Sequence, residues 1–222
     1  MNIDLSAIFA QYEALVAETD ALFERVRALH PDCVTCGLGC SDCCHAMFDL
    51  SLVEAMYLNG KFAASFDFGP ERSAVLERAS DADRHAYRIK RRMYRESEDG
   101  RPAEDILAEA ARERVRCPLL GEGDACVLYA HRPITCRLYG IPTAIGGKGH
   151  TCGKTAFRAG EKYPTVAVDR IQDRLAALSK EIAVAVGSRF SELHQVYVPV
   201  SMALLTRYDD AYLGIGKPKR DD

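Results

Sequence analysis

A run of closely spaced cysteines constrains this chain more than any other feature. Five of the nine cysteines fall between Cys33 and Cys44, with the spacing C-x2-C-x3-C-x2-C-C. Such a run indicates either a disulfide framework or a metal site, and the redox compartment separates the two.

The N-terminal residues favour the metal site. They have no basic start, their apolar residues are interrupted by Gln11 and Glu13, and they show no small-residue cleavage site, so we expect a cytoplasmic protein without a secretory signal. In a reducing cytosol, clustered cysteines are more often metal ligands or redox groups than disulfides. A bound cation also offsets the repulsion among several thiolates.

The other four cysteines form a second block. They are Cys117, Cys126, Cys136 and Cys152. Three of them stand in the motifs R-C-P-L-L, C-V-L-Y and H-R-P-I-T-C-R. Together with the preceding C-x3-C-x2-C-C run, these motifs resemble the bacterial cysteine-cluster proteins of the YkgJ type, described as a zinc- or iron-chelating domain. The resemblance covers a little over half of the chain and implies metal chelation. Flagellin lysine-N-methylases are distantly similar, which implies an alternative, an S-adenosylmethionine-dependent protein lysine methylase-like enzyme.

Eight cysteines are the predicted metal ligands. They are Cys36, Cys40, Cys43, Cys44, Cys117, Cys126, Cys136 and Cys152. In an extended chain the neighbours Cys43 and Cys44 point to opposite faces, so they are expected to serve two centres or to leave one thiol uncommitted. In one partition, the first three cysteines of the C-x3-C-x2-C-C run join one second-block cysteine, and Cys44 joins the other three. Cys33 lies outside the pattern and is the predicted spare.

Iron–sulfur clusters and zinc both accept all-thiolate ligands. Close x2 and x3 spacings with a remote cysteine are typical of iron–sulfur proteins, and Cys117-Pro118 is similar to the Cys-Pro pair of bacterial ferredoxins. Structural zinc more often uses two separated C-x2-C pairs, and the second block has none. The sequence therefore favours a [4Fe–4S] cluster, with structural zinc as the alternative.

Histidines and arginines accompany the cysteines. His45 and His131 are expected to surround the ligands or to lie on the surface, whereas His150 is weighed as a replacement ligand. Three arginines flank the ligands and are expected to neutralise cluster charge or to be solvated. They are Arg116, Arg132 and Arg137.

The spacing of Cys36, Cys40 and Cys43 also matches that of radical S-adenosylmethionine enzymes. Asp42, however, occupies the place where those enzymes usually carry an aromatic residue. Their chemistry sits in a barrel of alternating strands and helices, and this chain shows no such alternation. No catalytic acid, base or nucleophile is assigned.

Apolar periodicity predicts a mainly α protein, with helices packed around an irregular cysteine-rich metal-binding core and at most short strands. We expect a single domain over 1–222, made of an N-terminal helix in 1–30, the cysteine-cluster region 33–152 and C-terminal helices in 165–212. The pattern Ser51-Leu-Val-Glu54 predicts a capping box that opens a helix.

Four further local expectations follow from residue patterns. Residues 103–115 are predicted to form a helix, and 126–129 a short strand. The glycine-rich stretch 146–149 is expected to be a flexible loop that delivers His150 and Cys152. The tail 217–222 is expected to be disordered.

Charge bears on the partners. The net charge of −3 argues against a dedicated nucleic-acid binder, and no apolar run is long enough for a membrane span. The stretch 84–95 is rich in arginine with two interleaved tyrosines, which is typical either of an anionic-partner face or of a solvated helix face. We favour the solvated face.

The expected role is redox, electron transfer or metal handling with an unknown protein partner or redox partner.

Overall fold

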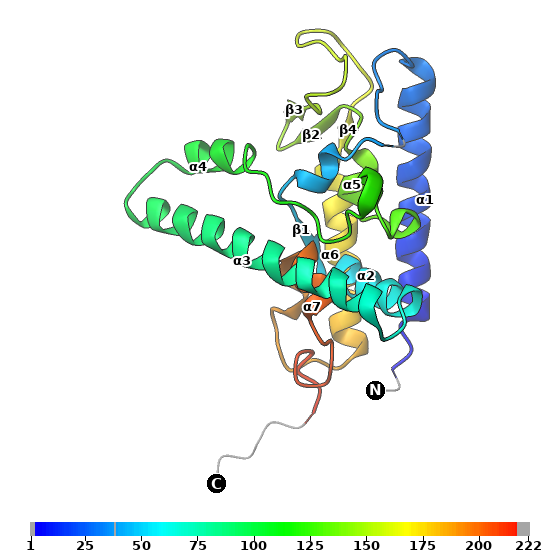
Figure 1. Cartoon of the computed structure of the whole chain (residues 1–222), viewed down its shortest axis with the longest axis vertical. Coiled ribbons are helices and arrows are strands. Elements are labelled where there is room, and N and C mark those ends of the chain that lie inside the picture. Colours follow the sequence, from blue (N-terminus) through cyan, green and yellow to red (C-terminus); the bar gives the residue numbers. More distant parts are fainter. Residues whose placement is uncertain (1–2, 38, 217–222) are drawn as a thin grey trace.

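The structure is a computed structural model that describes residues 3–37 and 39–216 (Figure 1), so the tail predicted to be disordered lies outside the described residues. The prediction of a mainly α fold with few short strands is confirmed. The main helices are α1 (Ser6–Leu29), α2 (Leu52–Ser65), α3 (Pro70–Glu98), α4 (Ala103–Ala110), α5 (Ile134–Leu138), α6 (Val168–Ala185) and α7 (Val200–Leu205).

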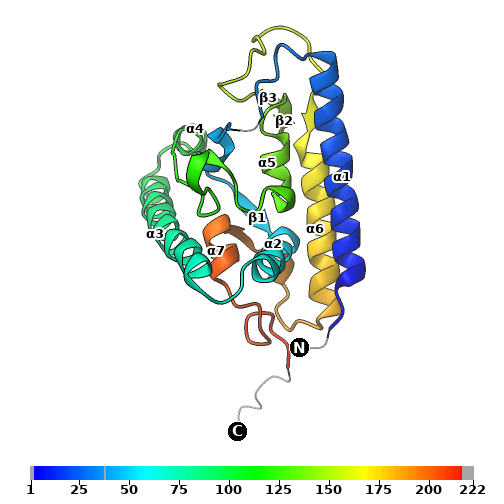
Figure 2. The same ribbon diagram turned by 45° about the vertical axis from the view of Figure 1, so that its right-hand side comes forward.

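Two long helices, α1 and α6, pack together in the main apolar core. α1 and α6 lie side by side (Figure 2), and α2 packs against both. Their facing sides are apolar at three- and four-residue steps, as in Tyr12 and Leu15 of α1 and Leu175 and Ile182 of α6, all at most 2% exposed. Burial of each such side chain stabilises the fold by about 1.5–3 kcal/mol.

The predicted capping box at α2 is confirmed. The Ser51 hydroxyl and backbone N–H both donate to Glu54 Oε2, at 3.0 and 3.2 Å. The other face of α2 meets α3 and α7 in a second apolar cluster that includes Leu58, Phe62 and Ala79. Cys117 and Cys126 pack against this cluster.

α3 and α4 form a helical hairpin whose tip projects from the body (Figure 1). The predicted helix over 103–115 was too long, because α4 ends at Ala110. The residues that follow bond to the first cysteine block instead: Val115 N–H donates to His45 O at 3.0 Å, and Arg114 bridges to Ala46. After Ala110, backbone hydrogen bonds to the first cysteine block therefore take the place of the hydrogen bonds that a longer helix would form.

Short strands form two small sheets. β1 (Asp49–Ser51) pairs antiparallel with β5 (Tyr197–Pro199), and β2 (Thr143–Ile145) lies between β3 (Lys148–His150) and β4 (Val166–Ala167). The described strands form no closed barrel, in agreement with our decision against a radical-enzyme fold.

Three local expectations need correction. Residues 146–149 were predicted to be a flexible loop, but Gly146 and Gly147, with φ of 55° and 77°, make the tight turn of the β2–β3 hairpin. Residues 126–129 are not a strand: a single bridge joins Cys126 to Leu120, and a 3₁₀ turn begins at Tyr129. The region 165–212 was predicted to contain C-terminal helices, but after α6 only Val200–Leu205 of this region is α-helical, in α7.

None of the helices in the described part of the chain combines the length and the apolar character that crossing a lipid bilayer requires.

Candidate metal centre

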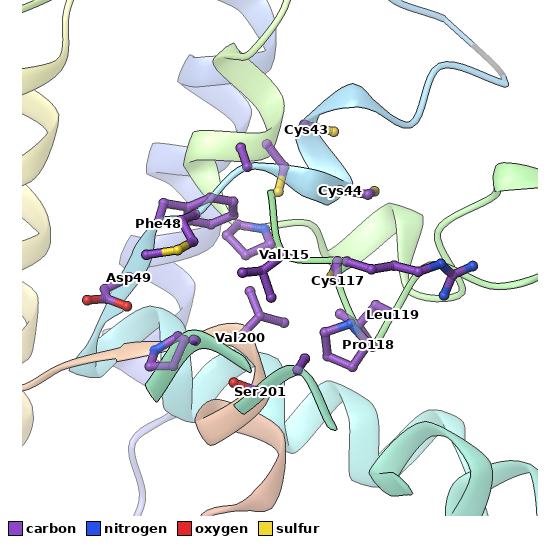
Figure 3. A pocket seen from close by; sticks show the side chains of 18 of the residues that line it. Cys43, Cys44, Phe48, Asp49, Val115, Cys117, Pro118, Leu119, Val200 and Ser201 are labelled. Atoms are coloured by element: carbon purple, nitrogen blue, oxygen red, sulfur yellow. The ribbon is translucent and has the colours of Figure 1, made fainter. Parts of the chain in front are cut away.

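Five cysteines from both blocks line one cavity of about 160 Å³. They are Cys43, Cys44, Cys117, Cys126 and Cys136. The first two come from a 3₁₀ helix (Asp42–His45), and Cys136 comes from α5. Figure 3 shows Cys43 and Cys44 at the end of the cavity opposite Val200 and Ser201. Segments nearly a hundred residues apart in sequence thus present thiols to the same space.

Backbone hydrogen bonds hold the two blocks together. Cys117 N–H donates to Cys44 O at 2.7 Å, and the next carbonyl, of Pro118, accepts from Arg78 Nε of α3 at 3.0 Å. Cys136 is positioned through α5, because Ile134 N–H at the start of that helix donates to Glu54 Oε1 at 3.2 Å. The capping residue of α2 therefore also anchors the helix that carries a thiol.

The remaining lining of this cavity is largely apolar. Phe48, Val115, Pro118, Leu119 and Val200 are among the side chains that face it. Burial raises the pKa of Cys126 and raises the pKa of Cys117 to about 12. Without a compensating cation these thiols therefore stay protonated at neutral pH.

Three of the thiols influence one another. The proximity of Cys136 and Cys44 lowers the pKa of the Cys43 thiol, whereas Cys43 raises the pKa of Cys44 and of Cys136. Cys43 is therefore the thiol of the three that ionises most readily.

Cys43 and Cys44 do not follow the expected geometry. The prediction that they face opposite sides assumed an extended chain, but they lie in a 3₁₀ helix, where successive side chains diverge by about a third of a turn. Both are buried and both line the same cavity. Their adjacency therefore does not by itself require two centres.

A second group of thiols lies on the outer side of Cys43. Burial raises the pKa of Cys36, and Cys40, Cys43 and Cys152 each raise it further by charge. Cys152 is therefore the second-block cysteine that the fold places with the first run. Gly140 allows this packing, because a Cβ there would lie 2.5 Å from Cys36 Cβ.

Asp42 connects Cys152 with Arg114. The Cys152 thiol donates to Asp42 Oδ2 at 3.4 Å, and Arg114 Nη2 donates to Asp42 Oδ1 at 2.6 Å. The carboxylate thus lies at the edge of the outer thiols with a cationic partner already in place.

Cys33 does not line the thiol cavity. Its carbonyl accepts a hydrogen bond from Ala156 N–H at 3.0 Å, in the segment that follows Cys152. Its role as the spare thiol stays a prediction.

The flanking arginines divide into two kinds. Arg116 and Arg132 line the thiol cavity, where their charges can balance a negatively charged cluster. Arg137 is buried and stabilises the fold instead, because it pairs with Asp20 at 2.6 Å and donates to the carbonyls of Ala130 and Arg132.

None of the three weighed histidines lines the thiol cavity. His45 Nδ1 lies 3.1 Å from Ser41 O, and His131 stacks edge-on against Tyr57. His150 is exposed on β3 and borders a neighbouring cleft.

Sequence reasoning missed the residues that close the cavity. Ala82 and Ala86 of α3 and Val200 at the start of α7 lie far from the cysteines in sequence. They are small or apolar residues with no motif around them, so only the packing of α3 on α7 identifies them.

Within residues 3–37 and 39–216, no group of three or more Cys, His, Asp or Glu side chains is preformed around a single metal position. The five thiols instead border a cavity of about 160 Å³.

No protein-family model matches this chain, and no curated protein or solved structure was found to be similar to it.

Proposed function

We propose that this chain holds one or two iron–sulfur clusters through its cysteine thiolates and serves in redox chemistry, electron transfer or metal handling. The observation that carries the proposal is the single cavity of about 160 Å³ onto which five thiols from four segments open. Disulfide-free thiols gathered in an apolar space are costly to ionise unless a cation is bound there.

The spacing of the cysteines supports a cluster over a structural zinc ion. Close x2 and x3 spacings with a remote cysteine are typical of iron–sulfur proteins. Structural zinc more often uses two separated C-x2-C pairs, and the second block has none. Structural zinc remains the alternative, since it takes the same thiolate ligands.

Two ligand sets follow from the proximity of the thiols. Cys44 would join the three cavity-lining cysteines of the second block, and Cys43 would join the outer group. The outer set is Cys36, Cys40, Cys43 and Cys152. A bound cluster supplies one-electron redox chemistry. The chain's own contribution is to exclude water with apolar side chains and to offset negative charge with Arg116 and Arg132.

The test is analysis of the full chain purified without oxygen, for iron, zinc and acid-labile sulfide, together with its visible spectrum. Iron and sulfide in equal amounts with brown absorption are expected. Zinc without sulfide or colour would contradict the cluster and support the alternative, a structural zinc protein. A chain free of both metals that also fails to take up iron and sulfide would remove the proposal altogether.

A further inference from the structure

A second and larger cavity lies beside the thiol cavity. It has a volume of about 700 Å³, within the range of about 300–1,000 Å³ that small-molecule sites occupy. We call it the α5–α6 cleft, because these helices line it together with β2, the segment 150–154 and the segment 46–49. The segment 46–49 lines both cavities and so forms the wall between them.

Most of the cleft surface is suited to an apolar body. Ile134 and Leu138 of α5 and Ile171 of α6 are buried at its floor, and Met47 and Phe48 form the wall toward the thiols. Polar side chains that can orient a ligand share this lining, among them Gln172 of α6, Thr135 of α5 and Tyr139. This combination is typical of a binding cleft for a small organic molecule.

One end of the cleft carries an unmatched positive charge. Arg114 pairs with Asp42 at 2.6 Å, and the carboxylate of Asp49 is held by Lys90 with oxygens at 2.8 and 2.7 Å. Both acidic groups of the cleft are thus already neutralised. Lys154 lies within electrostatic reach of Asp42. Among the described residues it forms no ion pair of its own, so its ammonium group is the surplus charge.

We propose that the α5–α6 cleft binds a small organic anion, whose apolar body lies on Ile134, Leu138 and Ile171 and whose acidic group faces Lys154 and Arg114. The proposal goes beyond the proposed metal centre and does not require it. None of the five cysteines that line the thiol cavity lines the cleft, although Cys152 and Asp42 of the outer thiols border it. A ligand there would lie against the wall of the thiol cavity, where a redox centre could act on it.

The probe for this site is anilinonaphthalene sulfonate, an aromatic anion, compared with its uncharged analogue phenylnaphthylamine. Binding to the full-length protein is followed by dye fluorescence with direct excitation of the dye. We expect the anion to bind more tightly than the neutral dye. Lys154→Glu should weaken anion binding by about tenfold and leave the neutral dye unaffected. Lys162→Glu, at an exposed residue outside the cleft, should change neither.

A second pair of variants tests the location. Gln172→Trp should fill the cleft and weaken both dyes, whereas Asp173→Trp, at the neighbouring exposed residue, should not. Circular dichroism confirms that each variant is folded. Equal binding of the two dyes by the wild type would overturn the anion assignment. Unchanged anion affinity in both Lys154→Glu and Gln172→Trp would overturn the site. The preference for the anion and its loss in Lys154→Glu are expected in both metal-loaded and metal-free protein, so failure of the metal centre leaves this test intact.

Discussion

Cys43 lies at the junction of the two groups of thiols. It affects the pKa of Cys44 and Cys136 in the cavity, and its charge also acts on Cys36 in the outer group. A residue placed between the two groups can be a ligand of either centre. Its neighbour Cys44 lines the cavity, where the charges of Cys117 and Cys126 act on it. Cys44 is therefore the better residue for testing the proposed ligand set that it forms with the three cavity-lining cysteines of the second block.

We expect Cys44→Ser to lower the iron and sulfide content of the anaerobically purified protein. A serine hydroxyl does not supply the soft thiolate that iron–sulfur clusters require. Loss of one of two clusters would remove about half of the iron, and loss of a single one nearly all of it. Cys33→Ser is the control and should keep the wild-type content, since Cys33 does not line the thiol cavity and is the predicted spare. Equal metal content in the wild type and the Cys44 variant would argue against the proposed ligand set.

Gly140→Ala tests the packing of the outer thiols. The new methyl group would lie 2.5 Å from Cys36 Cβ and 3.3 Å from a ring carbon of Phe23. Overpacking of this kind costs about 1–3 kcal/mol, which urea denaturation of the reduced, metal-free protein would measure.

The control for this substitution is Gly153→Ala, next to Cys152, where an added Cβ meets nothing within 4 Å. The free energy of unfolding should change little there. Equal stability of the two variants would contradict the close packing of Gly140 against Cys36.

At the scale of elements, Glu54 couples two helices. Its carboxylate caps α2 through Ser51 and accepts the Ile134 N–H that begins α5. The side chain is only 3% exposed. Burial raises the pKa of Glu54, and the hydrogen bonds from Ser51 and Ile134 offset this in part.

This shift predicts how stability depends on pH. The native state holds the Glu54 proton more tightly than the unfolded chain, so the contribution of Glu54 to stability is greatest below the unfolded pKa of about 4.3. It falls as pH rises through the raised native pKa. In Glu54→Gln this fall should be absent, so the difference in unfolding free energy between wild type and variant should change across that window.

The measurement is urea denaturation of metal-free, reduced protein over a pH series. Glu71→Gln, at an exposed residue in the first turn of α3, serves as the control and should run parallel to the wild type. A Glu54→Gln curve that also runs parallel would contradict the raised native pKa.

The elements that could be predicted are those fixed by local signals. The helix stripe of α1 and the capping box of α2 are short-range patterns, and the structure contains both. Residues 111–117 could not be predicted in this way. They bond to the 44–46 segment, about seventy residues away, and a helical pattern in sequence carries no information about such a partner.

At the scale of the whole molecule, the thiols are largely separate from the main core. The largest apolar cluster joins α1, α2, α5 and α6, and Cys36 alone among the predicted ligands packs against it. The ligand roles of the cysteines stay a prediction, and the sequence did not indicate that five of them line one cavity. The reason is that α3 and the start of α7 close that cavity with ordinary apolar residues.

This separation predicts a mild response to metal removal. After anaerobic chelation, the far-ultraviolet circular dichroism of the helices should be largely retained. The melting midpoint should fall by several degrees, since each kcal/mol of lost ligand binding lowers it by about 2–4 °C in a chain of this size. Complete loss of the helical signal would instead show that the core depends on the metal.

Iron K-edge X-ray absorption of the anaerobically prepared protein tests the central claim most directly. A thiolate-held cluster predicts that each iron has sulfur neighbours alone in its first shell and a second iron close by. Cys136→Ser should weaken that signal, because Cys136 lines the cavity. Iron surrounded by nitrogen or oxygen, or iron atoms without iron neighbours, would contradict a cluster in the thiol cavity.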